Sequence, residues 1–248
     1  MSQYSVAGNT SSYSFWLYRL VWRLVDWLYP PQCAGCGKGG MRWCMQCQEK
    51  VIKIMRPYCQ KCGIPTLGGE ICPTCLSKNP VYDAIRAYAL YEEPLRSGLH
   101  RLKYKRDIAL ADVFALNLIE LYYQQHWEID LVTAVPLGLV RLKERGYNQA
   151  SLLAYPFALA VRRPYRSNAL KRIRETASQV TLSVQERLAN VDGAFVADQA
   201  LVNGKNILVI DDVTTTGATM NACAQALKNA GANQVFGLTL ARAYHKKY

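Results

Sequence analysis

Several signals that assign a chain to a common class of protein are missing from this sequence of 248 residues. A G-x-x-x-x-G-K-[S/T] motif is absent, so an NTPase of the P-loop class lacks its phosphate-binding half. Met1–Ser14 contains no Lys or Arg and is followed by no cleavage site, which argues against a secretory signal. No apolar run reaches the ~20 residues of a membrane span, because Arg19, Arg23 and Asp26 interrupt Phe15–Tyr29. We therefore expect a cytoplasmic protein without a transmembrane segment.

Acidic residues and histidines are also scarce. The chain has 18 Asp and Glu against 30 Lys and Arg, which gives a formal charge of +12. Such a surplus favours polyanionic partners, among them phosphorylated sugars, nucleotides and nucleic acid. Only three histidines are present, and His100 has no second His or Cys near it in the sequence. We therefore expect His100 on an exposed helix face and not in a catalytic role.

The interrupted segment Phe15–Tyr29 is predicted to form an amphipathic helix whose charges share one face. Two locations suit such a helix. It can lie on a membrane surface, or it can pack against its own domain, which we favour. With the residues before it, it makes an N-terminal tail over residues 1–29.

Cysteine, in contrast, is concentrated in four C-x-x-C pairs, with Cys223 alone and far away as a buried thiol. Two such pairs close a tetrahedral zinc site, whereas neighbouring pairs make poor structural disulfides. Sites with four sulfurs have no open position, so we interpret both zinc ions as structural. If neighbouring C-x-x-C pairs share one zinc ion, residues 30–79 form a double zinc ribbon. The alternative is an interleaved arrangement, in which pairs that are not neighbours share a zinc ion. The predicted ligands are Cys33, Cys36, Cys44 and Cys47 for one zinc and Cys59, Cys62, Cys72 and Cys75 for the other.

The most informative stretch begins at Ile207–Ile210, an apolar run that suits a strand buried on both faces of a parallel sheet. Asp211 and Asp212 follow directly, and then a Thr-Thr-Thr-Gly-Ala-Thr loop before a helical pattern begins. We expect the strand to end at the two carboxylates. A polar loop at a helix N-terminus binds a phosphate monoester. The carboxylates can accept sugar hydroxyls or water bound to Mg²⁺. Helix capping alone would explain one Asp and one Thr and leaves the others unexplained.

This stretch resembles the signature of type I phosphoribosyltransferases, which bind phosphoribosyl pyrophosphate (PRPP) together with Mg²⁺. The resemblance implies that Asp211 and Asp212 hold the ribose 2′- and 3′-hydroxyls. It also implies a loop that holds the 5′-phosphate, formed by Thr214, Thr215, Thr216, Gly217, Ala218 and Thr219.

The remaining elements complete an α/β fold. Strands are expected at Asp83–Glu92, Leu131–Val135, Ala194–Val196 and Gln234–Ala241, with a helix over residues 107–126. These elements predict a parallel sheet flanked by helices, which occupies residues 80–248 and follows the small zinc-ribbon domain.

Basic side chains are predicted to line the anionic site. The loop after Leu131–Val135 carries Arg141 and Arg145, and loops at the carboxyl ends of parallel strands meet over one crevice. The planar fork of arginine suits a pyrophosphate. Lys103 is a further candidate, with a solvated helix face as its alternative. The polar segment Leu170–Gln179 is expected to close over a reactive sugar intermediate.

The order of these features over about residues 25–243 resembles the ComF family of competence proteins. The family pattern appears as Cys33–Cys75, as an R-x-x-x-R-G-Y-N-Q motif at Arg141–Gln149, as Arg172–Gln179 with Arg187 and Asn190, and as the PRPP signature at Ile207–Thr219. The resemblance implies a role in DNA uptake during transformation, with imported single-stranded DNA and proteins of the uptake machinery as partners.

Two functions follow from these observations. The first is a DNA-uptake protein with a site for PRPP and Mg²⁺, in which basic surfaces and aromatic stacking hold single-stranded DNA. The second is an active phosphoribosyltransferase in which Arg145 and Mg²⁺ neutralise the departing pyrophosphate. No segment identifies an acceptor base for such an enzyme. The tyrosines available for stacking are Tyr58, Tyr82, Tyr88, Tyr91 and Tyr104, although packing is the expected fate of most of them.

Overall fold

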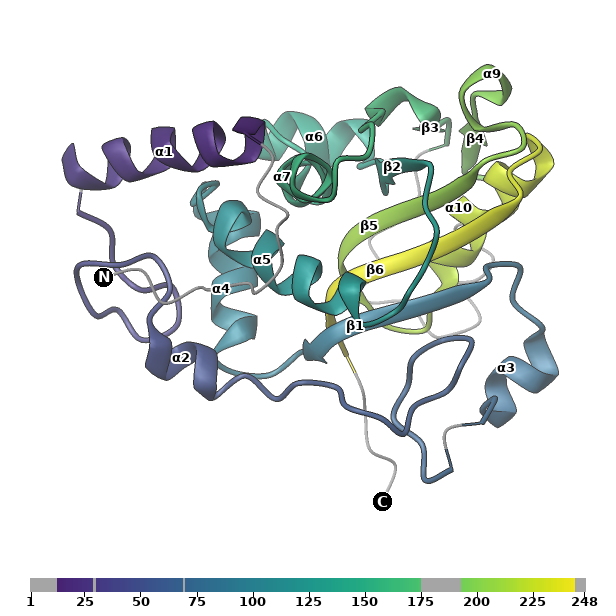
Figure 1. Cartoon of the computed structure of the whole chain (residues 1–248), viewed down its shortest axis with the longest axis horizontal. Coiled ribbons are helices and arrows are strands. Elements are labelled where there is room, and N and C mark those ends of the chain that lie inside the picture. The colour runs from purple at the N-terminus through teal and green to yellow at the C-terminus, as the bar shows by residue number, and fades with distance from the viewer. Residues whose placement is uncertain (1–12, 29, 69, 175–192, 244–248) are drawn as a thin grey trace.

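The computed structural model describes residues 13–28, 30–68, 70–174 and 193–243. Its centre is a four-stranded, fully parallel sheet in the order β1-β6-β5-β2 (Figure 1). The strands are β1 (Ala84–Leu90), β2 (Leu131–Ala134), β5 (Asn206–Thr214) and β6 (Gln234–Arg242). The predicted parallel sheet is therefore confirmed.

The two central strands are the most apolar, as burial on both faces requires. Ile207, Val209 and Ile210 are fully buried, and almost the whole of β6 is buried. One expected boundary was wrong, because β5 does not end before the carboxylates but continues to Thr214. The reason is its neighbour: β6 is long enough to pair with β5 up to Thr214, which lies opposite Arg242. The polar tail of β5 is thus held in the sheet by backbone hydrogen bonds.

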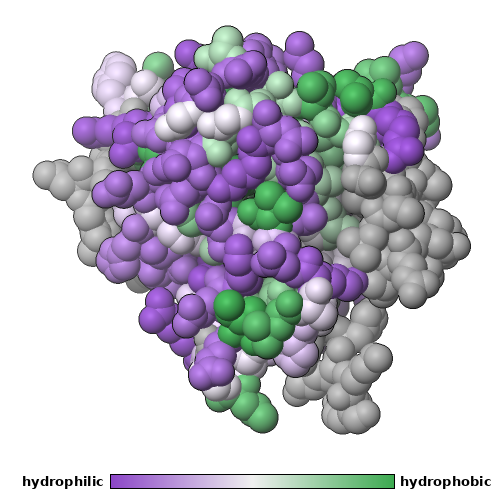
Figure 2. All heavy atoms as spheres, turned by 90° about the vertical axis from the view of Figure 1, so that its right-hand side faces the viewer, coloured by the Kyte–Doolittle hydropathy of each residue, from purple (hydrophilic) through white to green (hydrophobic). Residues whose placement is uncertain are grey.

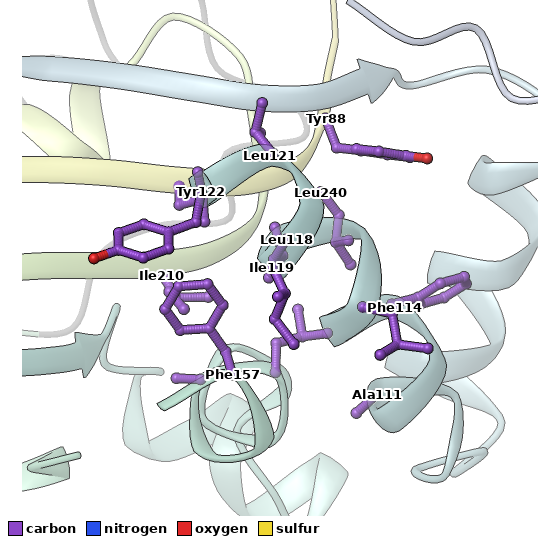
Figure 3. Packing of buried hydrophobic residues seen from close by; sticks show 14 of the residues in the cluster. Tyr88, Ala111, Phe114, Leu118, Ile119, Leu121, Tyr122, Phe157, Ile210 and Leu240 are labelled. Atoms are coloured by element: carbon purple, nitrogen blue, oxygen red, sulfur yellow. The ribbon is translucent and has the colours of Figure 1, made fainter. Parts of the chain in front are cut away.

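One face of the sheet is covered by α5 (Leu110–Tyr123) and α7 (Gln149–Val161). Figure 3 shows Phe157 of α7 and Tyr122 of α5 in this core, with their ring centroids 5.5 Å apart in an edge-to-face arrangement. The helix α4 (Leu95–Tyr104) joins the same cluster through Leu95, Leu99 and Leu102. The predicted helix over residues 107–126 is confirmed.

The opposite face is covered by α10 (Ala218–Asn229), whose Met220, Cys223 and Leu227 are buried against β5 and its neighbours. Cys223 is completely buried, as expected of a packed thiol. Beside α10 lie a short 3₁₀ helix and the small helix α9, with an antiparallel pair of strands between them. The bounds are η1 (Ser167–Ala169), β3 (Leu170–Arg172), β4 (Phe195–Ala197) and α9 (Gln199–Val202). Seen from the end that carries α3 and α10, the surface is mainly hydrophilic, with small separate apolar groups (Figure 2).

The cysteine-rich segment contains α2 (Met45–Glu49) and α3 (Pro73–Lys78) and lies along the β1 edge of the sheet (Figure 1). Lys53 forms an antiparallel bridge with Ala89 of β1, and the backbone N–H of Ile54 donates to the carbonyl of Tyr88 at 3.0 Å. The segment between the two cysteine clusters thus extends the sheet by a short antiparallel stretch. The domain boundary near residue 80 stays a prediction.

The N-terminal helix α1 (Tyr13–Leu28) packs on the α7 side of the molecule. Two of its charged side chains bind neighbouring parts of the protein: Arg19 pairs with Asp112 of α5 at 3.4 Å, and Asp26 pairs with Arg42. Its outward face is apolar, with Trp27 81% exposed. Within the described residues, no helix is both long and apolar enough to cross a bilayer.

The stretch after β2 differs from the expected loop, because Leu139–Arg145 forms the helix α6. This helix ends at Gly146, whose φ of +80° is the left-handed conformation typical of a helix C-cap. Of the predicted closing segment, Leu170–Arg172 pairs with β4. Residues 175–179 of this segment lie outside the described residues, and so do the motif residues Arg187 and Asn190.

Candidate functional site

The eight paired cysteines form two clusters, and in each the four Sγ atoms lie within 4.8 Å of one another. Cys33 and Cys47 are 3.6 Å apart, and Cys62 and Cys72 are 3.7 Å apart. Tetrahedral zinc with Zn–S bonds of about 2.3 Å separates its ligands by about 3.8 Å, whereas a disulfide needs about 2.05 Å. The clusters therefore have the geometry of zinc sites, and the pairing of adjacent C-x-x-C pairs is confirmed.

Backbone amides support these sulfurs. The N–H groups of Cys44 and Cys72 donate to Cys33 Sγ and Cys59 Sγ, each at 3.3 Å. Such bonds favour the thiolate form that a metal requires. Gly63 follows the third C-x-x-C pair with a φ of +72°, and a Cβ there would lie 2.5 Å from the carbonyl oxygen of Ile85. Glycine therefore lets the second cluster approach β1 closely.

A buried arginine connects the second cluster to the sheet. Arg242, 2% exposed at the end of β6, donates from Nη1 to the carbonyl of Cys62 at 2.6 Å. Four thiolates on one Zn²⁺ carry a net charge of −2, so the guanidinium neutralises part of this charge. Arg242 lies opposite Thr214 in the sheet. Arg242 therefore links the second cluster to Thr214, the first residue of the predicted phosphate loop.

The phosphate loop itself runs from the end of β5 into α10. Thr214 is the last, buried residue of the strand, Thr215 is exposed, and the Thr216 hydroxyl accepts the backbone N–H of Ala218 at 3.3 Å. Gly217 is the N-cap of α10 with a φ of +82° and has no side chain to bond the first helical turn. The cap residue therefore places no side chain over the positive end of the helix, a position that favours an anion.

The two carboxylates differ in their surroundings. Asp212 is 3% exposed, and its Oδ2 lies 2.5 Å from the Nζ of Lys103 on α4. Its other oxygen accepts a weak bond from Gln149 Nε2 at 3.4 Å. Asp211 remains partly exposed, and one of its oxygens accepts the backbone N–H of Asp212 at 2.9 Å. Asp212 is therefore held by Lys103 and Gln149, while Asp211 remains partly exposed to a ligand.

Their protonation follows from this arrangement. Burial and the neighbouring charge of Asp212 raise the pKa of Asp211 well above its usual range. Burial also opposes ionisation of Asp212, but the Lys103 ammonium outweighs it and lowers the Asp212 pKa. For Lys103, burial is in turn outweighed by Asp212, so its pKa is raised. The pair Lys103–Asp212 is thus ionised at neutral pH.

Arg145 reaches this pair through a glutamine. Its Nη1 donates to Gln149 Oε1 at 2.8 Å, and Gln149 contacts Asp212. Its guanidinium also lies 4.9 Å from the ring centroid of Tyr104 on α4. The structure therefore brings Arg145, Lys103 and Asp212 together. Arg141, also predicted for the site, is half-buried on α6, and no contact joins it to the carboxylates among the described residues.

The R-G-Y-N-Q motif has a physical explanation in these contacts. Tyr147 donates its hydroxyl hydrogen to the carbonyl of Leu102 and thereby ties the turn to α4. Asn148 caps α7 through the N–H of Ala150 and donates to the carbonyl of Val135 at 2.9 Å. The motif therefore fixes the start of α7, so that Gln149 faces Asp212. Sequence reasoning placed Gln149 near the site but missed its bridging position, because only the helix register reveals it.

Of the five tyrosines named for stacking, three are buried, namely Tyr58, Tyr82 and Tyr88. Tyr91 is partly buried, whereas Tyr104 is 58% exposed beside Arg145.

Two family profiles match the chain. The double zinc ribbon domain matches residues 24–76, which include both cysteine clusters. The phosphoribosyl transferase domain matches residues 137–248, which include α6, the carboxylates and the phosphate loop. The predicted fold class, a phosphoribosyltransferase-type sheet preceded by zinc ribbons, is therefore confirmed.

Three relatives match most of the chain. DNA utilization protein YhgH of Escherichia coli is 32% identical over 198 residues, which cover 77% of this chain and 86% of that protein. Competence protein F of Haemophilus influenzae is 30% identical over 212 residues, covering 81% and 90%. Competence protein ComFC of Bacillus subtilis is 27% identical over 235 residues, covering 90% of each. The chain belongs to the ComF family, which contains competence protein F and DNA utilization protein YhgH.

Proposed function

We propose that the chain binds a phosphorylated ribose of the PRPP type with Mg²⁺ and acts in the uptake or use of DNA, where it handles imported single-stranded DNA. The observation that carries the ribose site is the junction of β5 and α10. There, two adjacent carboxylates are followed by a helix N-terminus whose cap residue, Gly217, has no side chain. A pentose with a 5′-phosphate needs both an anion site and hydroxyl acceptors at this spacing.

The residues divide into three groups in this proposal. Thr214–Thr219 holds the 5′-phosphate with backbone N–H groups and hydroxyls. Asp211 and Asp212 accept the ribose hydroxyls, for which Asp212 exchanges its Gln149 contact for the ligand. Lys103, Arg145 and Arg141 supply the positive charge that a pyrophosphate requires. Mg²⁺ suits the partly exposed Asp211, because it prefers carboxylate, phosphate and water oxygens.

The DNA role is supported by the relatives and by charge. Two of the relatives are named competence proteins and one a DNA utilization protein. A formal charge of +12 favours a polyanion, and two zinc ions bound by eight thiolates leave about +8. We expect proteins of the DNA-uptake machinery as partners and the cytoplasm as location.

A second candidate is an active phosphoribosyltransferase of nucleotide metabolism. It is favoured by the profile match over residues 137–248. In this reaction Arg145 and Lys103 stabilise the departing pyrophosphate while positive charge develops on the anomeric carbon.

Calorimetric titration with PRPP, with and without Mg²⁺, tests the ribose site. We expect binding that depends on Mg²⁺ and is lost in Asp211→Asn. The matched control is Asp130→Asn, because Asp130 lies at the amino end of the parallel strands, where it accepts the N–H of Asn206. Unchanged PRPP affinity in Asp211→Asn would refute the site. Pyrophosphate release over a panel of nucleobases then separates the two candidates, since a binding protein releases none.

A further inference from the structure

An open, polar groove lies beside the proposed ribose site. It has a volume of about 760 Å³ and runs between α4 and the first cysteine cluster. Its lining is mostly aromatic and charged: Ala34, Tyr91, Glu93, Arg96, Ser97, His100, Arg101 and Tyr104. The zinc ribbon thus supplies one wall through Ala34, and α4 supplies most of the other.

The aromatic part of the groove is exposed, and its ring already contacts a guanidinium. Tyr104 is 58% exposed, and its ring centroid lies 4.8 Å from that of His100 at an angle of 45°. On the side of the ribose site, the Arg145 guanidinium lies 4.9 Å from the Tyr104 ring. An exposed aromatic ring flanked by a guanidinium is a platform on which a nucleobase stacks.

The charged part of the groove suits a phosphate. Arg96 is exposed, and no carboxylate in the described ranges pairs with its guanidinium. The other arginine, Arg101, is bound to Asp107 at 2.9 Å. The one acidic lining residue, Glu93, accepts bonds from Ser97 at its own end of α4. Arg96 therefore offers its charge to a ligand, about two helical turns from Tyr104.

A shared helix connects the groove with the ribose site. Lys103, which binds Asp212, directly precedes Tyr104 on α4. Tyr104, which lines the groove and contacts Arg145, therefore joins the groove to the side chains around Asp212.

We propose that this groove binds a nucleotide unit, with its base stacked on Tyr104 beside His100 and its phosphate bound by Arg96. This nucleotide unit belongs to single-stranded DNA, and this part of the inference rests on the proposed DNA role. A free mononucleotide has the same chemistry and is the other source.

The experiment measures binding of the zinc-loaded full chain to a fluorescent 20-nucleotide oligo-dT by anisotropy, and to dTMP and PRPP by calorimetry. The variants are Arg96→Glu and Tyr104→Leu. The matched control is Arg162→Glu, an equal charge reversal at an exposed residue. Arg162 follows the C-terminal end of α7, whereas Gln149 near the site lies at the N-terminal end of this helix.

We expect Tyr104→Leu to weaken oligo-dT binding by roughly 5- to 150-fold, the range of base–aromatic stacking. Arg96→Glu should weaken it and reduce the slope of log affinity against log salt by about 1. Arg162→Glu should stay within about twofold of the wild type, because exposed charges far from the ligand are screened. PRPP binding should persist in Arg96→Glu, because Arg96 lies outside the proposed ribose site.

Each outcome decides the matter. If both groove variants lose affinity for oligo-dT, the groove binds a nucleotide of single-stranded DNA. If they lose affinity for dTMP and not for oligo-dT, the groove binds a free mononucleotide. Equal effects of Arg96→Glu and Arg162→Glu, or no binding of either ligand by the wild type, overturn the groove proposal. If the wild type binds oligo-dT but not PRPP, and the groove variants weaken oligo-dT binding, the groove proposal is supported and only the ribose site is refuted.

Discussion

Removing the ammonium of Lys103 should destabilise the protein strongly. The Lys103 and Asp212 side chains are only 18% and 4% exposed, and their charged atoms lie 2.5 Å apart. Lys103→Met keeps the aliphatic stem but leaves the Asp212 carboxylate buried without its counter-ion. Breaking a buried pair in this way costs about 3–5 kcal/mol. For a chain of this size, this corresponds to a melting temperature lower by roughly 6–20 °C.

The pH dependence of this loss has a definite sign. Folding lowers the Asp212 pKa, so the pair contributes stability above the unfolded value of about 3.9 and loses it as the pH falls through the folded pKa. In Lys103→Met, burial is no longer outweighed by an ammonium, so the pKa of Asp212 rises. The variant should therefore be less stable at pH 7.5, and its deficit should shrink at pH 5.5 as Asp212 takes up a proton.

Denaturant unfolding in zinc-containing buffer measures both effects, with Lys105→Met as the matched control, because Lys105 is exposed two residues away. Adding Asp212→Asn to Lys103→Met should recover part of the loss, since neither charge is then buried alone. If Lys103→Met unfolds within about 0.5 kcal/mol of Lys105→Met at pH 7.5, the ion pair does not stabilise the fold.

Three further predictions concern the metal and the backbone. Gly63→Ala should lower the melting temperature, because its Cβ would lie 2.5 Å from the Ile85 carbonyl oxygen, while Gly39→Ala meets nothing within 4 Å and should not. Gly217→Val should weaken PRPP binding, because a β-branched residue disfavours the φ of +82° at the predicted phosphate loop, and its effect on the melting temperature should be smaller. Equal PRPP affinity of the variant and the wild type would contradict this. Chelation of zinc should release two metal ions per chain and abolish cooperative unfolding, which a metal assay with circular dichroism measures.

Much of the fold could be predicted because its signals are local. The run Ile207–Ile210 indicates a doubly buried strand by composition alone, and C-x-x-C spacing indicates a metal site without knowledge of the fold. The bounds of polar segments were harder to predict. Asp211 and Asp212 have a low strand propensity, yet pairing with β6 keeps this end of β5 in the sheet. Leu139–Arg145 forms a helix where a loop was expected.

The site was predicted less completely, because its contacts are long-range. Lys103 and Asp212 are more than a hundred residues apart in the chain, and only the packing of α4 against the sheet brings them together. No sequence period could predict that Lys103 would be a counter-ion, or that Gln149 would link Arg145 to the same carboxylate. In contrast, the Thr-rich loop was predictable, because all of its parts are adjacent in the sequence.

The bond from Arg242 to Cys62 has a practical consequence for work with the purified protein. A chain that has lost its second zinc ion loses the support of the strand end that faces Thr214. Such a preparation would look inactive toward a sugar phosphate although every side chain of the site is intact. Metal stoichiometry should accordingly be established for each batch before a negative binding result is credited to the pocket.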